Sequence, residues 1–327
     1  MRAAYITRLG PATEIQVGDL PVPVPGPTDV LVRVEVVAVN PVDVLVRSGG
    51  YPTPTPFPFV VGRDLMGTVA EAGPGAVGFA VGDRVWCNSL GHGGRQGSSA
   101  EYAVVPAERL YHLPGAADPV EAVALFHPGA TAYLALFRRG GLRATETVYV
   151  GGAAGNVGTA LTGLASIGGA RVLAGARAED AEWCRAAGAD EVVEYRDPDL
   201  RGRLAALAPA GVDLYVDTSG HLDLPAALDL LADGGRIVLM AGPAQRLTLP
   251  AGALYTHDRR IVGFVISRAG TGELAEAAAV LNGRLAAGDL PVRIRAVWPL
   301  ERTVEAHRAV ERGLRGRTVL RVADPEP

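Results

Sequence analysis

The residues best suited to chemistry form a glycine-rich stretch at positions 147–158, which reads T-V-Y-V-G-G-A-A-G-N-V-G. Three of its glycines would let the backbone turn tightly, approach a pyrophosphate closely and pack the next helix against a strand. The N–H groups that begin this helix would then face the phosphates. Ala153 replaces the first glycine of the common G-x-G-x-x-G pattern. The stretch predicts a dinucleotide site made by Gly152, Ala153, Ala154, Gly155, Asn156, Val157 and Gly158.

Strands and helices alternate around this stretch, from residue 147 to about residue 266. Gly188 and the pair Gly234-Gly235 follow the helical runs Ala178–Ala187 and Leu222–Ala232, where C-cap glycines are expected. Apolar, β-branched strands separated by such helices predict an α/β fold with a doubly wound parallel sheet, the Rossmann arrangement. The predicted strands are Thr147–Val150, Arg171–Ala176, Glu191–Tyr195, Val212–Asp217, Arg236–Met240 and Ile261–Ile266.

Length and composition limit the class of protein. The 327 residues leave room for about two domains, and 48% hydrophobic residues can form a sizeable core. A net charge of −4 argues against a nucleic-acid partner. The N-terminus lacks the apolar core of a signal peptide, and no apolar run approaches the roughly 18 residues of a membrane span. We therefore expect a cytoplasmic protein with neither membrane nor nucleic-acid partners.

Two residue types are scarce enough to exclude chemistry. The chain has no lysine, so Schiff-base catalysis and a Tyr-Lys acid pair are excluded. The only cysteines, Cys87 and Cys184, lie far apart in sequence. A four-cysteine structural zinc site is therefore impossible.

The N-terminal half has a different pattern from the Rossmann part. Short predicted strands lie between Gly-Pro and Gly-Asp turns, which is typical of a compact β-rich domain. The segment Val292–Val322 also ends in a strand-like run, Thr318–Val322. The simplest arrangement is a β-rich domain of residues 1–120 and 267–327, interrupted by a Rossmann domain of residues 121–266. The predicted N-terminal strands are Val30–Val39, Leu65–Glu71, Arg84–Cys87 and Glu101–Val105.

Several motifs in one order point to a family. They are N-P-V-D-V-L-V-R-S-G-G-Y at 40–51, F-V-V-G-R-D-L-M-G-T-V-A-E-A-G at 59–73, G-D-R-V at 82–85, A-E-Y at 100–102, T-A-Y at 131–133 and the glycine loop. Over nearly its whole length the chain resembles the quinone oxidoreductase (ζ-crystallin-like) branch of the medium-chain dehydrogenase/reductase superfamily. The resemblance implies a GroES-like catalytic domain, formed by both chain ends, around a Rossmann domain. It also implies a nicotinamide in the cleft between them.

The resemblance also predicts that this protein does not bind the zinc ion of its zinc-dependent relatives. Zinc-dependent members carry a cysteine at the position of Asn40, and Gly-His-Glu where this chain has Gly62-Arg63-Asp64. An amide and a guanidinium cannot replace a thiolate and an imidazole as zinc ligands. The six histidines show no ligand spacing and are most simply loop or surface residues. Hydride transfer without a metal favours acceptors already activated by conjugation, such as quinones, enones or enoyl thioesters.

The choice of cofactor depends on the end of the second Rossmann strand. NAD enzymes place an acid there for the ribose 2′-OH, whereas NADP enzymes use a cation or a small polar group. This chain has Arg177 at that place. Tyr195, in E-Y-R-D after the third strand, matches the position where related reductases place a tyrosine on the 2′-phosphate. Arg177 could also be a solvated arginine and Tyr195 a strand-end aromatic; their positions favour NADPH.

The resemblance implies three pocket residues but no clear proton donor. Asn40 matches a pocket asparagine whose amide could hydrogen-bond the substrate carbonyl as it gains negative charge. Tyr51 matches a tyrosine that could donate a proton or stack on a planar substrate. Thr131, in T-A-Y, should lie near the nicotinamide or pack between the domains. Leu45 replaces a second tyrosine, which makes the pocket more apolar.

The segment Asn88–Ser99 is too glycine-rich to be rigid, and would either fold over the substrate or form a long surface loop. Three functions stay open. The first is NADPH-dependent reduction of a quinone or enone. The second is reduction of an enoyl thioester in a biosynthetic pathway. The third is a cofactor-binding protein without enzymatic function.

The predicted strand Ile261–Ile266 should lie at the edge of the Rossmann sheet. It is apolar and carries no charge, so an open edge there would be an aggregation hazard. The resembled family joins two Rossmann sheets into one across a two-fold axis, which implies a homodimer through this strand. The alternative is a monomer whose edge is shielded by the predicted helix Glu273–Ala287.

Overall fold

The computed structural model describes residues 1–115 and 117–323, and the chain forms two compact units. Unit 1 comprises Met1–His127, Ala269–Ala287 and Val292–Pro327. Unit 2 comprises Pro128–Arg268 and Gly288–Pro291. The sequence-based boundaries, after residues 120 and 266, lie slightly N-terminal to these divisions. The assignment of substrate to one unit and cofactor to the other remains a prediction.

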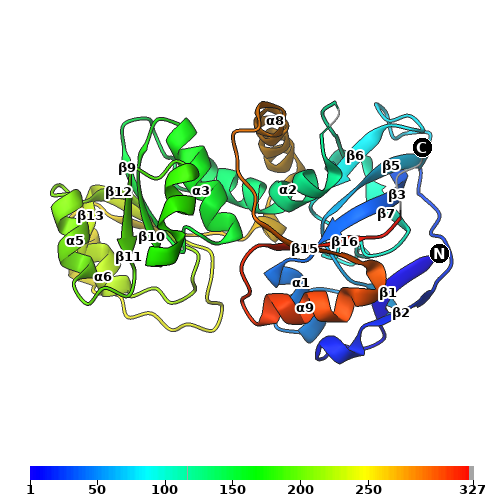
Figure 1. The fold of residues 1–327 in the computed structure, drawn as a ribbon, viewed down its shortest axis with the longest axis horizontal. Helices are drawn as coiled ribbons and strands as arrows, with labels where there is room; N and C mark the ends of the chain where they lie inside the picture. The colour runs from blue at the N-terminus through cyan, green and yellow to red at the C-terminus, as the bar shows by residue number, and fades with distance from the viewer. Residues whose placement is uncertain (116, 324–327) are drawn as a thin grey trace. The chain divides into compact units, whose positions relative to one another are not determined.

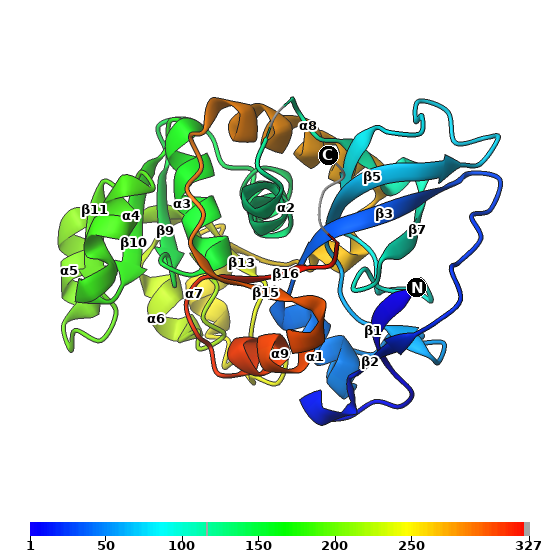
Figure 2. The same ribbon diagram turned by 45° about the vertical axis from the view of Figure 1, so that its right-hand side comes forward.

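Unit 1 is built on two β-sheets. A three-stranded sheet has the order β2-β1-β4, and a seven-stranded sheet has the order β15-β16-β3-β5-β6-β8 with β7 paired to β3. Strand β16, near the C-terminus, lies beside β3, so both chain ends build the larger sheet (Figure 2). The strands are β1 (Arg2–Ile6), β2 (Gln16–Asp19), β3 (Asp29–Ala38), β4 (Phe59–Val60), β5 (Leu65–Ala72), β6 (Arg84–Cys87), β7 (Tyr102–Pro106), β8 (Tyr111–His112), β15 (Ile294–Pro299) and β16 (Arg317–Arg321).

The helices of unit 1 are α1 (Pro41–Ser48), α8 (Thr271–Ala287) and α9 (Thr303–Glu311), with short 3₁₀ turns at Ala12–Glu14, Ala107–Arg109 and Leu300–Arg302. Helix α1 has residues typical of a helix start and a helix end. Pro41 occupies its first turn, the Asp43 carboxylate accepts the Asn40 N–H at 2.8 Å, and Gly49 ends it at φ +83°. Helices α1 and α9 lie side by side (Figure 1). Strand β3 lies inside the large sheet and is almost wholly buried. Its valines form much of the core of this sheet.

Unit 2 holds a six-stranded parallel sheet of order β11-β10-β9-β12-β13-β14, as expected for a Rossmann fold. Figure 1 shows α3 on one side of this sheet and α5 and α6 on the other. The strands are β9 (Thr147–Gly151), β10 (Arg171–Ala176), β11 (Glu191–Glu194), β12 (Val212–Asp217), β13 (Leu231–Leu239) and β14 (Arg260–Gly263). The helices are α3 (Asn156–Ile167), α4 (Ala181–Ala186), α5 (Leu200–Leu207), α6 (Leu224–Asp229) and α7 (Ala251–Tyr255), with 3₁₀ turns at Ala178–Asp180 and Ile266–Arg268.

Three details of unit 2 differ from the prediction. The last strand ends at Gly263, since the chain turns into a 3₁₀ helix at Ile266–Arg268. The predicted helix Leu222–Ala232 ends early, at Asp229. Gly234-Gly235 then lies inside β13, where the pairing with β12 shifts register, so these glycines form an irregularity in the strand instead of a helix cap.

Helix α2 (Pro119–Tyr133) begins in unit 1 and ends in unit 2, and it continues as a π-helical turn at Leu134–Arg139. The 21 residues Pro119–Arg139 are, by length and composition, long and apolar enough to cross a membrane, whereas no such run was expected from the sequence. However, 78% of the most apolar window is buried inside the protein. A core helix of a water-soluble protein passes the same test.

Candidate functional site

The loop between β9 and α3 has the backbone of a dinucleotide-binding turn. Gly152 has φ +72°, which favours glycine. A Cβ on Gly158 would lie 2.1 Å from the Gly152 carbonyl oxygen, so α3 packs directly on the loop. At Gly155, the exposed N-cap of α3, a Cβ would meet only that oxygen, at 3.2 Å. The space next to Gly155 is thus open beside the first N–H groups of α3, which have no acceptor within the helix. Phosphate binding there stays a prediction.

Ala153 anchors this loop to the sheet. It is fully buried, and its N–H donates to the Gly175 carbonyl of β10 at 3.0 Å. Thr218, after β12, donates its hydroxyl to the Gly151 carbonyl at 3.0 Å. The glycine turn is therefore held from both neighbouring strands, which fixes its shape before any ligand binds.

Arg177 and Tyr195 are neighbours because β10 and β11 run parallel with Ala176 opposite Glu194. The Arg177 Nε donates to the Tyr195 hydroxyl at 3.1 Å. This hydrogen bond raises the pKa of Arg177 and lowers the pKa of Tyr195. Tyr195 is 41% exposed, and Arg177 is exposed as well. The two predicted residues thus form one accessible polar pair at the end of the sheet.

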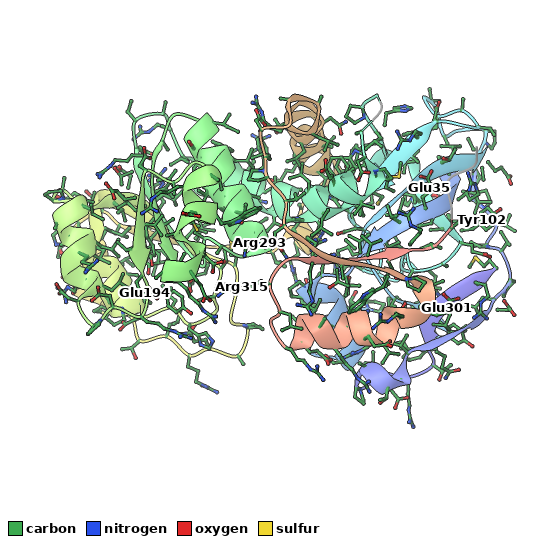
Figure 3. The ribbon with its side chains drawn as sticks, viewed as in Figure 1. Glu35, Tyr102, Glu194, Arg293, Glu301 and Arg315 are labelled. Atoms are coloured by element: carbon green, nitrogen blue, oxygen red, sulfur yellow. The ribbon has the colours of Figure 1, made fainter. Side chains whose placement is uncertain are left out.

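Three charged residues beside this pair were not predicted. The Arg196 guanidinium lies 5.6 Å from the centre of the Tyr195 ring and adds a second cation. Glu194, labelled in Figure 3, accepts hydrogen bonds from the backbone N–H of Ala178, after β10, and from that of Arg196, after β11. Glu179 pairs with Arg177 at 3.5 Å. An anion that binds Arg177 must therefore compete with Glu179. In the sequence, the E-Y-R-D motif that contains Tyr195 could have indicated Arg196 as a second cation at this site.

Unit 1 gathers polar residues at one end of its large sheet. Extending the β16–β3 register places Arg317 beside Asn40, and extending the β5–β6 register places Asp64 beside Asn88. All four residues are at most 2% exposed. We call Asn40, Asp64, Asn88, His127 and Arg317 the polar cluster. Five separate segments of the chain contribute to it.

Asn40 is held inside the polar cluster. Its Nδ2 donates to Asp64 Oδ2 at 2.8 Å, and its Oδ1 accepts from the Arg317 guanidinium at 2.8 Å. Arg317 also donates to Asp64 Oδ2 at 3.2 Å. Both ends of the Asn40 amide are thus engaged within unit 1. Its contact with a substrate carbonyl stays a prediction, and its orientation is set by Asp64 and Arg317.

Two charged residues of α1, Asp43 and Arg47, are buried in the structure that surrounds Asn40. Burial and the nearby Asp64 carboxylate raise the pKa of Asp43 to about 6. The Arg47 guanidinium is 1% exposed and pairs with Glu311 of α9. Beside it lies His307, which is fully buried and whose pKa is lowered to about 3 by burial and by Arg47.

The prediction that each histidine lies in a loop or on the surface is wrong for two of the six. His307 is fully buried on α9, and His127 is 7% exposed on α2. The His127 Nδ1 lies 3.2 Å from Asp64 Oδ1 and 3.2 Å from the Asn88 carbonyl oxygen. The only sequence signal was a lone histidine within an apolar helix, which is more often a core residue.

Tyr51 lies just beyond α1, with its N–H donating to the Leu45 carbonyl at 3.0 Å. It packs against a small core of unit 1 and is partly exposed. Its ring centre lies 5.7 Å from that of His92, in the Asn88–Ser99 loop. A partly exposed phenol fits either predicted role of Tyr51, proton donation or stacking.

The Asn88–Ser99 loop is anchored, contrary to the expectation from its glycine content. The Gln96 side chain accepts the Val60 N–H at 2.7 Å and donates to the Pro56 and Pro58 carbonyls. The Gly93 N–H donates to the Thr53 hydroxyl at 2.8 Å. Side-chain hydrogen bonds supply the order that backbone propensity does not. The loop lies against residues 53–61.

Thr131 is the last of the predicted pocket residues. It lies on α2 and is 8% exposed.

Within residues 1–115 and 117–323, no three His, Cys, Asp or Glu side chains are grouped as a metal ion requires. The positions that carry zinc ligands in zinc-dependent relatives hold Asn40 and Arg63 here. The fold and the glycine loop together define a two-domain oxidoreductase of the dehydrogenase type.

Comparison with known proteins agrees with this class. Residues 26–115 match the alcohol dehydrogenase GroES-like domain family, and residues 156–282 match the zinc-binding dehydrogenase family. The chain is 30% identical to the quinone oxidoreductase of Homo sapiens over 316 residues, covering 96% of this chain and 94% of that protein. The chain belongs to the quinone oxidoreductase branch of the medium-chain dehydrogenase/reductase superfamily.

Two solved structures show the same fold. One is an NAD-dependent alcohol dehydrogenase, with a TM-score of 0.89, 33% identity, and coverage of 99% of this chain and 100% of that one. The other is a mycobacterial protein in complex with NADPH, with a TM-score of 0.85, 29% identity, and coverage of 98% and 100%. Similar folds thus occur with either nicotinamide cofactor, and the choice depends on this chain's own residues.

Proposed function

We propose that this protein is a zinc-independent, NADPH-dependent reductase that transfers hydride to a conjugated carbonyl compound, a quinone or an enone. The observation that carries the proposal is the Arg177–Tyr195 pair at the end of β10 and β11. These residues replace the acid that NAD enzymes place at this point. Bound NADPH supplies the hydride. The glycine loop would hold its pyrophosphate, and Arg177, Tyr195 and Arg196 its 2′-phosphate.

The polar cluster supports zinc independence through its chemistry. A guanidinium, Arg317, already neutralises the Asp64 carboxylate and binds the Asn40 amide. An amide is a poor zinc ligand compared with a thiolate, and guanidinium groups do not bind cations. Without a Lewis acid, the acceptor must be activated by its own conjugation. Tyr51 and the apolar Leu45 suit a planar, apolar substrate.

An acceptor panel tests this function. Oxidation of NADPH is followed with ortho-quinones, small enones and crotonyl thioesters, with and without a chelator, and bound metal is measured. We expect turnover of quinones or enones that chelators do not change, and no stoichiometric zinc. Preference for the thioester would indicate a biosynthetic enoyl-thioester reductase. Tight NADPH binding without turnover would indicate a non-enzymatic protein. Activity lost to a chelator and restored by zinc would contradict zinc independence.

Cofactor selectivity is predicted to depend on Arg177. We expect wild-type protein to bind NADPH at least about tenfold more tightly than NADH, since a tenfold ratio is only about 1.4 kcal/mol and one charge-assisted contact supplies that much. Arg177→Ala should weaken NADPH binding by about tenfold or more and leave NADH binding unchanged. Fluorescence titration measures both. The matched control is Arg201→Ala, another exposed arginine of unit 2, paired with Asp229. Equal affinities of the wild type for both cofactors would rule out the assignment.

We expect two copies of the chain to pair through the open edge of β14 and to form a homodimer in the cytoplasm. In the described part of the chain β14 is the last strand of its sheet. The Phe264 N–H donates inward to Leu239 of β13 at 2.9 Å, so by alternation the N–H groups of Ile261 and Gly263 point to the open edge. Light scattering should give about twice 33.8 kDa. Gly263→Pro removes one outward donor and should give a folded monomer, with its circular dichroism unchanged. A monomeric wild type at micromolar concentration would contradict the dimer.

A further inference from the structure

Thr159 is a buried residue of α3 whose hydroxyl group contacts the glycine turn. The residue is 5% exposed. Its Oγ1 accepts a hydrogen bond from the Trp183 indole Nε1 at 2.9 Å and lies 3.3 Å from the Ala153 carbonyl oxygen. An indole N–H can only donate and a carbonyl oxygen can only accept, so the Thr159 hydroxyl donates its own proton to Ala153. The direction of both hydrogen bonds is therefore fixed.

These hydrogen bonds hold Ala153 from the side of the helices. Ala153 lies in the turn between β9 and α3, and Trp183 lies on α4, which follows Arg177 in the chain. On the side of the sheet, the Ala153 N–H donates to the Gly175 carbonyl of β10 at 3.0 Å. The two peptide groups that flank the Ala153 Cα are thus both held, one by the sheet and one by Thr159.

The orientation of the second peptide group determines where the next N–H points. This peptide group is trans, so its C=O and its N–H point in opposite directions. The Ala153 carbonyl points to the buried Thr159 hydroxyl, and the Ala154 N–H therefore points away from it. In the part of the chain that the structure describes, this N–H has no acceptor. The next residue, Gly155, is exposed at the start of α3.

We infer that Thr159 is a positioning residue for the cofactor, because it directs the Ala154 N–H toward the pyrophosphate of NADPH. This inference rests on the proposed function, in which the glycine loop holds the pyrophosphate. Trp183 occupies a lone pair of the Thr159 hydroxyl and so keeps its proton directed at Ala153. A donor that is oriented before the ligand arrives loses little freedom on binding, which strengthens the contact. NADPH and NADH share the pyrophosphate, so Thr159 acts on both cofactors, unlike Arg177.

Thr159→Val tests this role, because valine has nearly the same shape but no hydroxyl group. We expect NADPH and NADH each to bind about tenfold more weakly, the contribution of one hydrogen bond to a charged group. The ratio of the two affinities should keep its wild-type value, whereas Arg177→Ala lowers that ratio. Thr159→Ser keeps the hydroxyl group and should restore both affinities to within about twofold of the wild type. Fluorescence titration measures all of these affinities.

Thr162 provides a matched control on the same helix. It is fully buried, it lies one turn after Thr159, and among the described residues its hydroxyl has no hydrogen-bond partner. Thr162→Val should therefore bind both cofactors as the wild type does. Wild-type affinities in Thr159→Val would overturn the inference and leave the reductase function intact. A change in the affinity ratio, or no rescue by Thr159→Ser, would also overturn it.

The Ala154 N–H gives a readout in the wild-type protein, whatever the stability of the variants. Labelling alanine with carbon-13 at its carbonyl and with nitrogen-15 selects, by NMR, the N–H groups that follow another alanine. The Ala154 signal is the one that disappears in Ala153→Gly. Saturation with NADPH or with NADH should shift this signal downfield, because a phosphate oxygen is a strong acceptor. A signal that stays in place when the cofactor binds overturns the inference. A wild type that binds neither cofactor overturns the proposed function and this inference with it.

Discussion

Gly158→Ala is expected to weaken NADPH binding by more than about 100-fold, or about 2.7 kcal/mol, and to destabilise unit 2. The new Cβ would lie 2.1 Å from the Gly152 carbonyl oxygen and 2.7 Å from the Ala153 Cα. Both atoms belong to the backbone, so no side chain can rotate away. The loop must move away from α3, which disrupts the turn that would hold the pyrophosphate. Fluorescence titration with NADPH and thermal melting measure the two effects.

Two matched glycines separate the causes. Gly283→Ala, in α8 of unit 1, meets no atom within 4 Å and should be neutral or slightly stabilising. Gly155→Ala meets only the Gly152 oxygen, at 3.2 Å, so the fold should survive. Its methyl group would still occupy the approach to the pyrophosphate and weaken NADPH binding. Wild-type affinity in Gly158→Ala would show that this loop does not bind the cofactor.

Arg317→Met is expected to lower the free energy of unfolding of unit 1 by about 3–5 kcal/mol, because it leaves a buried carboxylate without its cation. Arg317 is 2% exposed and donates to both Asn40 and Asp64. Urea unfolding is followed by tryptophan fluorescence in a Trp183→Phe background. The remaining tryptophans, Trp86 and Trp298, then both report unit 1.

A surface ion pair is the control for this effect. Arg8 pairs with Glu14 at 2.6 Å, but its side chain is 75% exposed. Arg8→Met should therefore lower the free energy of unfolding far less than Arg317→Met. Combining Arg317→Met with Asp64→Asn should cost less than the sum of the two single changes, because the stranded charge is removed. Additive costs, or a loss for Arg317→Met no larger than for Arg8→Met, would contradict the buried ion pair.

Local patterns accounted for most of the Rossmann unit. The strands Arg171–Ala176 and Val212–Asp217 were predicted to the residue, and Gly188 caps α4 at φ +106° as expected. Errors arose where contacts between strands override local preference. Gly234-Gly235 resembles a helix cap in sequence, but the shifted pairing of β13 with β12 takes these residues into a strand. The glycines of Asn88–Ser99 suggested mobility, but Gln96 supplies distant hydrogen bonds.

The sequence by itself determined the glycine turn, the cation at Arg177 and the absence of the usual zinc ligands at Asn40 and Arg63, because these depend on residue type and short spacing. Only the tertiary structure decided the polar cluster. Asn40 and Arg317 are 277 residues apart, and Asn40 and Asp64 are 24 apart. Their meeting depends on strand order and register in the large sheet, which no local pattern encodes. The tertiary structure also brings Asp64 within 3.2 Å of the ring of His127, which lies on α2.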